Sequence, residues 1–168
     1  MNREFPAEAR DEEFLSLRQE RADACLRGHP CTSTLPENRM KTILIIDDDD
    51  ALRQILRLSL VQLGYAVHQA SNGKIGLRMY GEQRIDLVIT DLLMPEKDGF
   101  EIIMDLRKID PTVKIIVMSG GARLRSEEIL PIAKQLGAAL TLNKPFSFDE
   151  LRVAVSYILG NTPDLEVD

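Results

Sequence analysis

Residues 42–48 read Thr-Ile-Leu-Ile-Ile-Asp-Asp, an unbroken apolar run that ends in two aspartates. Apolar runs of this length are typical of strands buried on both faces, as in a parallel sheet. Three further runs follow the same plan: Leu-Val-Ile-Thr before Asp91, Ile-Ile-Val-Met before Ser119, and Ala-Leu-Thr-Leu-Asn before Lys144. Because ligands of such sheets bind beyond the carboxyl ends of the strands, we expect these polar residues to meet at one edge.

Amphipathic helical segments separate the strands. In the first of these segments, the side chains expected to face the core recur at the i, i+3, i+4 spacing of a helix: Leu52, Ile55, Leu56, Ser59, Leu60 and Leu63. The pattern predicts strands over residues 43–46, 67–70, 85–90, 113–118 and 139–142. Strand and helix therefore alternate five times, which predicts an α/β fold with a doubly wound parallel sheet.

Two helix starts can be predicted from single residues. Asp49 is expected to cap the first helix, and Asp50 to be a solvated helical residue, because acidic side chains suit a helix N-terminus. Pro131 would fall inside the fourth helix if Ser126 were its N-cap, and a proline there removes a helical hydrogen bond. We therefore expect this helix to begin near Leu130.

Composition limits the classes of function. The chain has 168 residues, and its formal net charge of −6 argues against non-specific binding to nucleic acid, which needs a basic surface. No apolar stretch approaches the roughly 18 residues of a membrane span, and no hydrophobic segment of a signal peptide begins the chain. We expect a cytoplasmic protein that binds neither DNA nor membranes.

The two ends of the chain differ in character from the middle. Residues 1–39 are rich in charged residues and proline, and we expect a dispensable extension that is partly disordered or forms one weak helix. Cys25, His29 and Cys31 offer three metal ligands there, whereas a closed zinc site needs four, so free thiols are favoured. Residues 161–168 read as an acidic tail.

The polar residues at the strand ends become specific when they are taken together. Asp47-Asp48, Asp91 within Thr90–Gly99, Ser119, and Lys-Pro-Phe at 144–146 resemble the receiver domain of two-component response regulators. The resemblance covers about residues 41–160 and implies a receiver domain over 40–160. It also implies a flavodoxin-like, five-stranded parallel sheet of order 2-1-3-4-5 with helices on both faces.

The acidic residues suit a divalent cation. Magnesium prefers oxygen ligands and is held by one or two carboxylates. Asp48 and Asp91 can ligate Mg²⁺ (or Mn²⁺) directly, and Asp47 directly or through water; the resemblance adds the backbone carbonyl of Leu93. At an effective dielectric constant of 20, two like charges about 4 Å apart repel by about 4 kcal/mol. A bound cation and the ammonium of Lys144 would offset that repulsion.

Each remaining residue has an expected role. Asp91 is the candidate phosphoacceptor, because a carboxylate can take a phosphoryl group as an acyl phosphate. Ser119 and Lys144 are expected to sense that group. Receivers often carry an aromatic residue three positions before the lysine, and its rotation accompanies activation. Here that position holds Thr141, so the aromatic switch is absent. The resemblance also implies a cis peptide bond at Lys144–Pro145.

These expectations combine into a stand-alone response regulator. It would take a phosphoryl group from a phosphohistidine on a sensor histidine kinase or a phosphotransfer protein and act on an unidentified protein target. It would catalyse only its own phosphorylation and dephosphorylation. Two alternatives stay open: a phosphatase of the haloacid dehalogenase type using Asp47 and Asp49, and a receiver-fold binding module that is not phosphorylated. The aspartate that becomes phosphorylated distinguishes them.

Overall fold

The computed structural model describes residues 39–94, 99–120 and 126–160. Contacts within the chain divide it into residues 1–39 and 40–168, and every element below belongs to the second unit. The predicted extension, with its two cysteines, and the predicted acidic tail lie outside the described residues, apart from Arg39.

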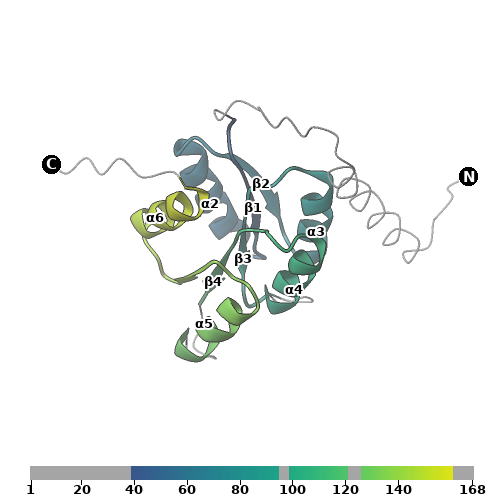
Figure 1. Ribbon diagram of the computed structural model, residues 1–168. Coiled ribbons are helices and arrows are strands. Elements are labelled where there is room, and N and C mark those ends of the chain that lie inside the picture. Colours follow the sequence, from purple (N-terminus) through teal and green to yellow (C-terminus); the bar gives the residue numbers. More distant parts are fainter. Residues whose placement is uncertain (1–38, 95–98, 121–125, 161–168) are drawn as a thin grey trace, which may run out of the picture. The chain divides into compact units, whose positions relative to one another are not determined.

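Five parallel strands form one sheet in the order β2-β1-β3-β4-β5 (Figure 1). Their bounds are Thr42–Ile46 for β1, Ala66–Ala70 for β2, Leu87–Asp91 for β3, Ile115–Ser119 for β4 and Leu140–Asn143 for β5. The predicted fold class and strand order are confirmed. The side chains of the three central strands are covered on both faces of the sheet, which explains why their sequences are continuously apolar.

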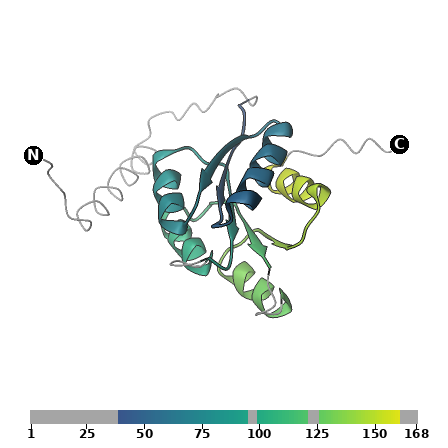
Figure 2. The same ribbon diagram turned by 180° about the vertical axis from the view of Figure 1, so that it is seen from behind.

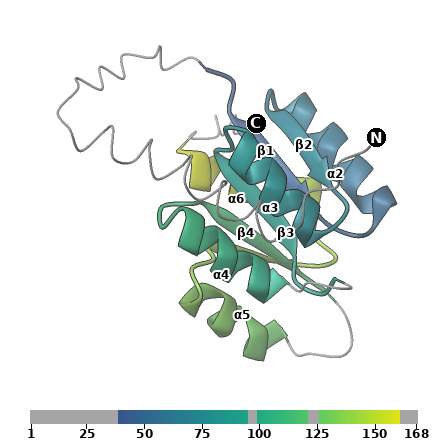
Figure 3. The same ribbon diagram turned by 90° about the vertical axis from the view of Figure 1, so that its right-hand side faces the viewer.

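Helices cover both faces of this sheet. They are α2 (Asp50–Gln62), α3 (Gly73–Glu82), α4 (Gly99–Ile109), α5 (Ser126–Gln135) and α6 (Phe148–Leu159). The α2 and α6 helices lie on one face, and α3, α4 and α5 on the other (Figures 1 and 2). Figure 3 looks onto the face that α3, α4 and α5 cover. None of the described helices is both long and apolar enough to cross a membrane.

Alternation along the strands divides the core into two layers. In β1, Ile43 and Ile45 pack with α2 and α6, whereas Leu44 and Ile46 pack in the layer that includes α3 and α4. Successive strand residues point to opposite faces, so a single apolar run supplies both layers. The sheet is therefore held on both sides, and its carboxyl edge is a rigid platform.

The buried face of α2 differs from the predicted one. Ile55 is 61% exposed, although its spacing suggested the core. Arg53 is instead buried together with Leu56 and Leu60, at positions i, i+3 and i+7 of one stripe. The partial burial of Leu52 against the same core agrees with the prediction. The prediction failed because apolar spacing alone allows two overlapping stripes, and packing against the sheet selects one of them.

The β3 strand starts and ends later than the predicted 85–90. Its ladder with β1 begins at the pair Ile43 and Leu87. Asp86 lies before the ladder, where its carboxylate accepts a hydrogen bond from the N–H of Thr42 at 2.8 Å. Asp91 is consequently the last residue of the strand and pairs in register with Met118. The backbone of Asp91 is thus part of the sheet itself.

The expected start of the fourth helix near Leu130 is wrong. The α5 helix begins at Ser126 and includes Pro131. A proline inside a helix removes one hydrogen bond and costs about 3 kcal/mol. Packing opposes that cost, because Ala133 in the next turn is completely buried in the core that α5 shares with α3 and α4. The local signal of Pro131 therefore does not decide where this helix begins.

Candidate functional site

Three carboxylates meet at the carboxyl edge of the sheet. Asp47 directly follows β1, Asp48 is next in the chain, and Asp91 ends β3. Because β1 and β3 are paired neighbours, these ends lie side by side, and oxygens of the three carboxylates come within 4.8 Å of one another. Asp47 is 1% and Asp91 6% exposed, whereas Asp48 faces solvent. The site is therefore open on the side of Asp48.

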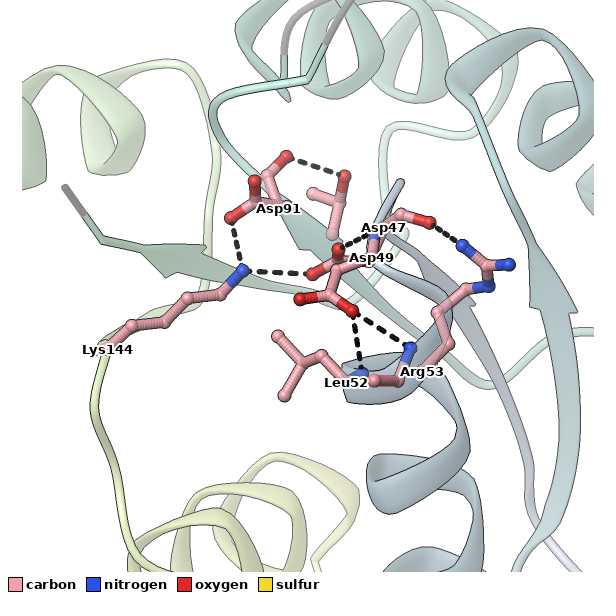
Figure 4. Close-up of polar contacts among 8 residues, drawn as sticks. Asp47, Asp49, Leu52, Arg53, Asp91 and Lys144 are labelled. Carbon is pink, nitrogen blue, oxygen red and sulfur yellow. Dashed lines mark hydrogen bonds and ion pairs between the residues drawn. The ribbon is translucent and has the colours of Figure 1, made fainter.

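Lys144 joins the two buried carboxylates. Its Nζ lies 2.9 Å from Asp47 Oδ2 and 2.8 Å from Asp91 Oδ1, as Figure 4 shows. Lys144 follows β5, so its long side chain reaches past β4 to the ends of β1 and β3. Its N–H donates to the carbonyl of Ser119 at 2.7 Å, and the peptide bond to Pro145 is cis, as expected. One ammonium thus compensates two buried negative charges.

Burial and pairing shift the titration of this cluster. Burial raises the pKa of the Asp91 carboxyl above its ordinary 3.8, even though the Lys144 ammonium opposes the rise. Burial lowers the pKa of Lys144, but hydrogen bonds and charges from Asp91 and Asp47 outweigh it, so the pKa lies above 10.5. Lys144 therefore stays charged at neutral pH, and Asp91 is more basic than an ordinary aspartate.

The other predicted residues surround this cluster without joining its ion pairs. Ser119 ends β4 and is 5% exposed, and no described residue forms a hydrogen bond with its hydroxyl. Leu93, two residues after Asp91, is 40% exposed. Thr141 lies in β5, half-buried, in register with Val117. The predicted ligand role of Leu93 and the sensing role of Ser119 stay predictions.

Two glycines allow close approaches beside the site. A Cβ on Gly99 would lie 2.5 Å from the carbonyl oxygen of Asp91 and 2.7 Å from the Cα of Leu92. A Cβ on Gly120 would lie 2.5 Å from the Cβ of Lys144. The first residue of α4 therefore lies against the backbone at the end of β3, and Gly120 lies against the Cβ of Lys144.

The loop from β1 to α2 is held by its own polar groups. The N–H of Asp49 donates to Asp47 Oδ1 at 2.8 Å. The carboxylate of Asp49 accepts from the N–H groups of Ala51 and Leu52, at 2.9 and 3.1 Å, so the predicted N-cap is confirmed. On the other side of the loop, Arg53 Nη1 donates to the carbonyl oxygen of Asp47 (Figure 4). The sequence analysis missed this arginine.

The side chains at this edge of the sheet favour one kind of ligand, a hard divalent cation. Three carboxylates with one face open to solvent match the hard oxygen ligands of Mg²⁺ or Mn²⁺. An ammonium beside the buried pair can neutralise charge on an incoming anionic group. The geometry therefore supports cation binding together with a reaction at one carboxylate.

Comparisons with known proteins agree with this geometry. The family described as response regulator receiver domain matches residues 43–156. The chain is 36% identical, over 117 residues, to sporulation initiation phosphotransferase F of Bacillus subtilis, covering 70% of this chain and 92% of that protein. It is 38% identical to the DNA-binding transcriptional regulator NtrC of Azospirillum brasilense, over 73% of this chain but 25% of that protein.

A solved structure shows the same arrangement of elements. The receiver domain protein from Clostridium thermocellum superposes with a TM-score of 0.67 at 31% identity, covering 72% of this chain and 95% of that one. Several curated relatives are much longer, and this chain spans a quarter of their length or less. The likeness is thus confined to the receiver domain of those larger proteins.

Proposed function

Because the chain belongs to the response regulator receiver family, we propose that it accepts a phosphoryl group on Asp91 and signals through protein contacts. The observation that carries the proposal is the joining of Asp91 and Asp47 through the ammonium of Lys144, at 2.8 and 2.9 Å. The carboxylate that we propose as the nucleophile thus lies beside a positive charge at the open edge of the sheet. Asp49, which a phosphatase of the haloacid dehalogenase type would use, caps α2 instead.

Asp47, Asp48 and Asp91 would hold the divalent cation, Mg²⁺ or Mn²⁺, with the backbone carbonyl of Leu93 as a further ligand. The convergence of the three carboxylates supports this assignment. When bound, the cation supplies charge neutralisation at the oxygens of the transferred group. The exposure of Asp48 supports entry from solvent.

The transfer is a displacement at phosphorus. A carboxylate oxygen of Asp91 forms the new O–P bond, and the N–P bond of the phosphohistidine breaks. Its electron pair stays on that ring nitrogen, and because the other ring nitrogen carries a proton, the histidine leaves as neutral imidazole. The raised pKa of Asp91 supports nucleophilicity, since a more basic carboxylate donates electrons more readily. Lys144 balances charge on the transferring oxygens, and the hydroxyl of Ser119 donates a hydrogen bond to one of them.

We also propose how phosphorylation would change the contacts that the protein makes. A phosphoryl group adds about −1.5 to −2 charges, enough to attract Lys144 and Ser119 and to bias a nearby two-state segment. Thr141 supplies no aromatic ring for the usual switch, so we propose that signalling relies on the movement of Ser119 and Lys144.

A single-domain protein fits this role. The relative from Bacillus subtilis, which the chain covers over 92% of its length, supports a regulator without an effector domain. A sensor histidine kinase or phosphotransfer protein would be the donor and another protein the target, without contact to DNA, which the net charge of −6 supports. The reaction needs a phosphohistidine made from ATP, so we place the protein in the cytoplasm.

The proposal is tested by phosphorylation with acetyl phosphate and Mg²⁺, followed by intact-mass and peptide mass spectrometry. The unaltered protein should gain one phosphoryl group, Asp91→Asn should gain none, and Asp149→Asn, an exposed aspartate on α6, should behave like the unaltered protein. Label on Asp47, or undiminished label on Asp91→Asn, would overturn the assignment. Absence of any label would favour a binding module that is not phosphorylated.

A further inference from the structure

Arg53 is an unusual residue for the inner face of a helix. It is 8% exposed, in line with the apolar Leu56 and Leu60. Arginine is almost never fully buried unless its charge is paired, because removing a charge from water costs several kcal/mol. The position therefore needs a compensating reason, and apolar packing of α2 does not supply one.

The contacts of Arg53 lead to the acidic cluster. One terminal nitrogen, Nη1, donates to the main-chain carbonyl oxygen of Asp47, and the other, Nη2, forms an ion pair with the carboxylate of Asp50. The Asp50 side chain is 89% exposed, so that pair lies toward solvent. The buried partner is the carbonyl of a residue whose side chain lies in the site.

Asp47 is held at four atoms. Its N–H donates to the carbonyl of Ala70, its Oδ1 accepts from the N–H of Asp49, and its Oδ2 pairs with Lys144. Arg53 holds the remaining polar group, the carbonyl. In Figure 4, Lys144 and Arg53 approach Asp47 from opposite sides. The two cations therefore fix its side chain and its main chain respectively.

We propose that Arg53 is a positioning residue for divalent-cation binding: its guanidinium holds the Asp47 carbonyl and thereby sets the turn that presents Asp47 and Asp48 to the cation. The proposal deepens the proposed function and rests on it in one respect, that these carboxylates hold the metal. The planar guanidinium matters because its two terminal nitrogens reach Asp47 and Asp50 together, which the single ammonium of a lysine cannot reproduce.

The direction in which metal affinity changes when Arg53 is removed distinguishes a positioning role from a purely electrostatic one. A positive charge near a cation site repels the cation, so a purely electrostatic Arg53 would weaken metal binding, and its removal would tighten it. A positioning Arg53 predicts the opposite, because its loss frees the main chain between Asp47 and Asp48. Residues that orient metal ligands typically contribute about 10- to 100-fold to affinity.

The test is a Mn²⁺ titration of the full chain, with free Mn²⁺ followed by electron paramagnetic resonance and the thermal midpoint recorded for each variant. Arg53→Met should weaken Mn²⁺ binding by about tenfold, at the low end of the range for such residues. Arg53→Lys should weaken it to a similar extent, because the charge remains but the shorter lysine side chain loses the contact with the Asp47 carbonyl. This second variant tests the proposal if Arg53→Met does not fold.

Two matched controls come from the same helix. Arg57→Met removes an equal charge from the next turn of α2 and should leave the affinity within about twofold. Asp50→Asn breaks the solvent-facing ion pair but keeps the carbonyl contact, so it should cost less than about threefold. A loss in Asp50→Asn equal to that in Arg53→Met would overturn the role of the carbonyl contact.

Other outcomes are equally decisive. Tighter Mn²⁺ binding by Arg53→Met would overturn the proposal in favour of plain repulsion. A lower thermal midpoint with unchanged affinity would overturn it in favour of a structural role. If the unaltered protein binds Mn²⁺ but Arg53→Met binds equally well, this inference fails alone; if the unaltered protein binds no Mn²⁺, the proposed cation site fails with it.

Discussion

Two halves of the same sheet edge are held in different ways. In the acid half, at the ends of β1 and β3, Asp47 and Asp91 are buried and share the ammonium of Lys144. We call the other half, on β4 and β5, the sensing half after its proposed role; there, no described residue forms a hydrogen bond with the Ser119 hydroxyl. Lys144, the second proposed sensor, follows β5 but is already paired with the acid half. Both halves stand on strands of the same rigid sheet.

This difference in pairing matches the different requirements of phosphoryl transfer and of sensing the transferred group. Carboxylates that bind a cation and attack phosphorus must be arranged before the reaction, because correct placement supplies much of the rate. A sensing hydroxyl must instead be able to exchange partners when a new anion arrives. The paired carboxylates of Asp47 and Asp91 meet the first requirement, and the Ser119 hydroxyl meets the second. Four substitutions test this difference, and their predicted effects decrease in the order given.

Gly99→Ala should have the largest effect on stability. Its new Cβ would meet the carbonyl oxygen of Asp91 and the Cα of Leu92, backbone atoms that cannot rotate away. Overpacking of this kind costs about 1–3 kcal/mol, and we expect the upper end. Gly120→Ala, in the sensing half, would place a Cβ 2.5 Å from the Cβ of Lys144, an atom that side-chain rotation does not move. It should also cost about 1–3 kcal/mol, but nearer the lower end, because only this one atom lies closer than 3.0 Å. Urea denaturation measures both losses, and equal losses would contradict this difference in local packing.

Lys144→Ala should destabilise the protein in metal-free buffer but leave the fold intact. It leaves two buried carboxylates facing each other, and breaking a buried pair costs about 3–5 kcal/mol. Because the Lys144 side chain is 24% exposed, we expect about 2 kcal/mol.

Added Mg²⁺ should restore most of that loss, since the cation replaces the missing charge. The exposed Lys114→Ala is the control and should show no dependence on Mg²⁺. The comparison fails if Mg²⁺ leaves the stability of Lys144→Ala unchanged. Phosphorylated Lys144→Ala should also lose its partner response, which a binding assay can measure.

Asp91→Asn should change how stability depends on pH. The pKa of Asp91 is raised in the folded state, so the proton is held more tightly there than in the unfolded chain. The stabilisation that results from this raised pKa is complete below pH 3.8, where Asp91 is protonated in both states. It is lost as the pH rises through the pKa of the folded state. Relative to Asp91→Asn, the unaltered protein should therefore lose stability across that window in metal-free buffer.

Thermal melts of both proteins across that range provide the measurement. Ser119→Ala, in the sensing half, is the control and should follow the unaltered protein at every pH. A constant difference between the unaltered protein and Asp91→Asn would show that Asp91 is not the group that titrates.

Thr141→Val should have the smallest effect. Thr141 shares no ion pair with the three carboxylates, and valine keeps its shape within β5. Mn²⁺ affinity and the rate of phosphorylation by acetyl phosphate should stay within about twofold. A tenfold change in either would show that the sensing half is coupled to the acid half before phosphorylation.

Much of the fold could be predicted because its signals are local. Apolar runs mark the buried strands, and Asp49 marks the start of α2 within a few residues of its partners. Predictions failed where distant parts compete with a local signal. Ile55 has the spacing of a core residue but lies exposed, and Pro131 lies inside a helix that packing maintains.

The candidate site divides in the same way. The residue types at the strand ends follow from the sequence alone, and with them the expectation of a cation site and a reactive carboxylate at one edge. The sharing of Lys144 by Asp47 and Asp91 and the burial of Arg53 behind Asp47 were decided only by the tertiary structure. Lys144 and Asp47 are 97 residues apart, so only the order of the strands brings them to 2.9 Å. A local pattern can specify which side chain ends a strand, but pairing and burial depend on neighbours that the fold supplies.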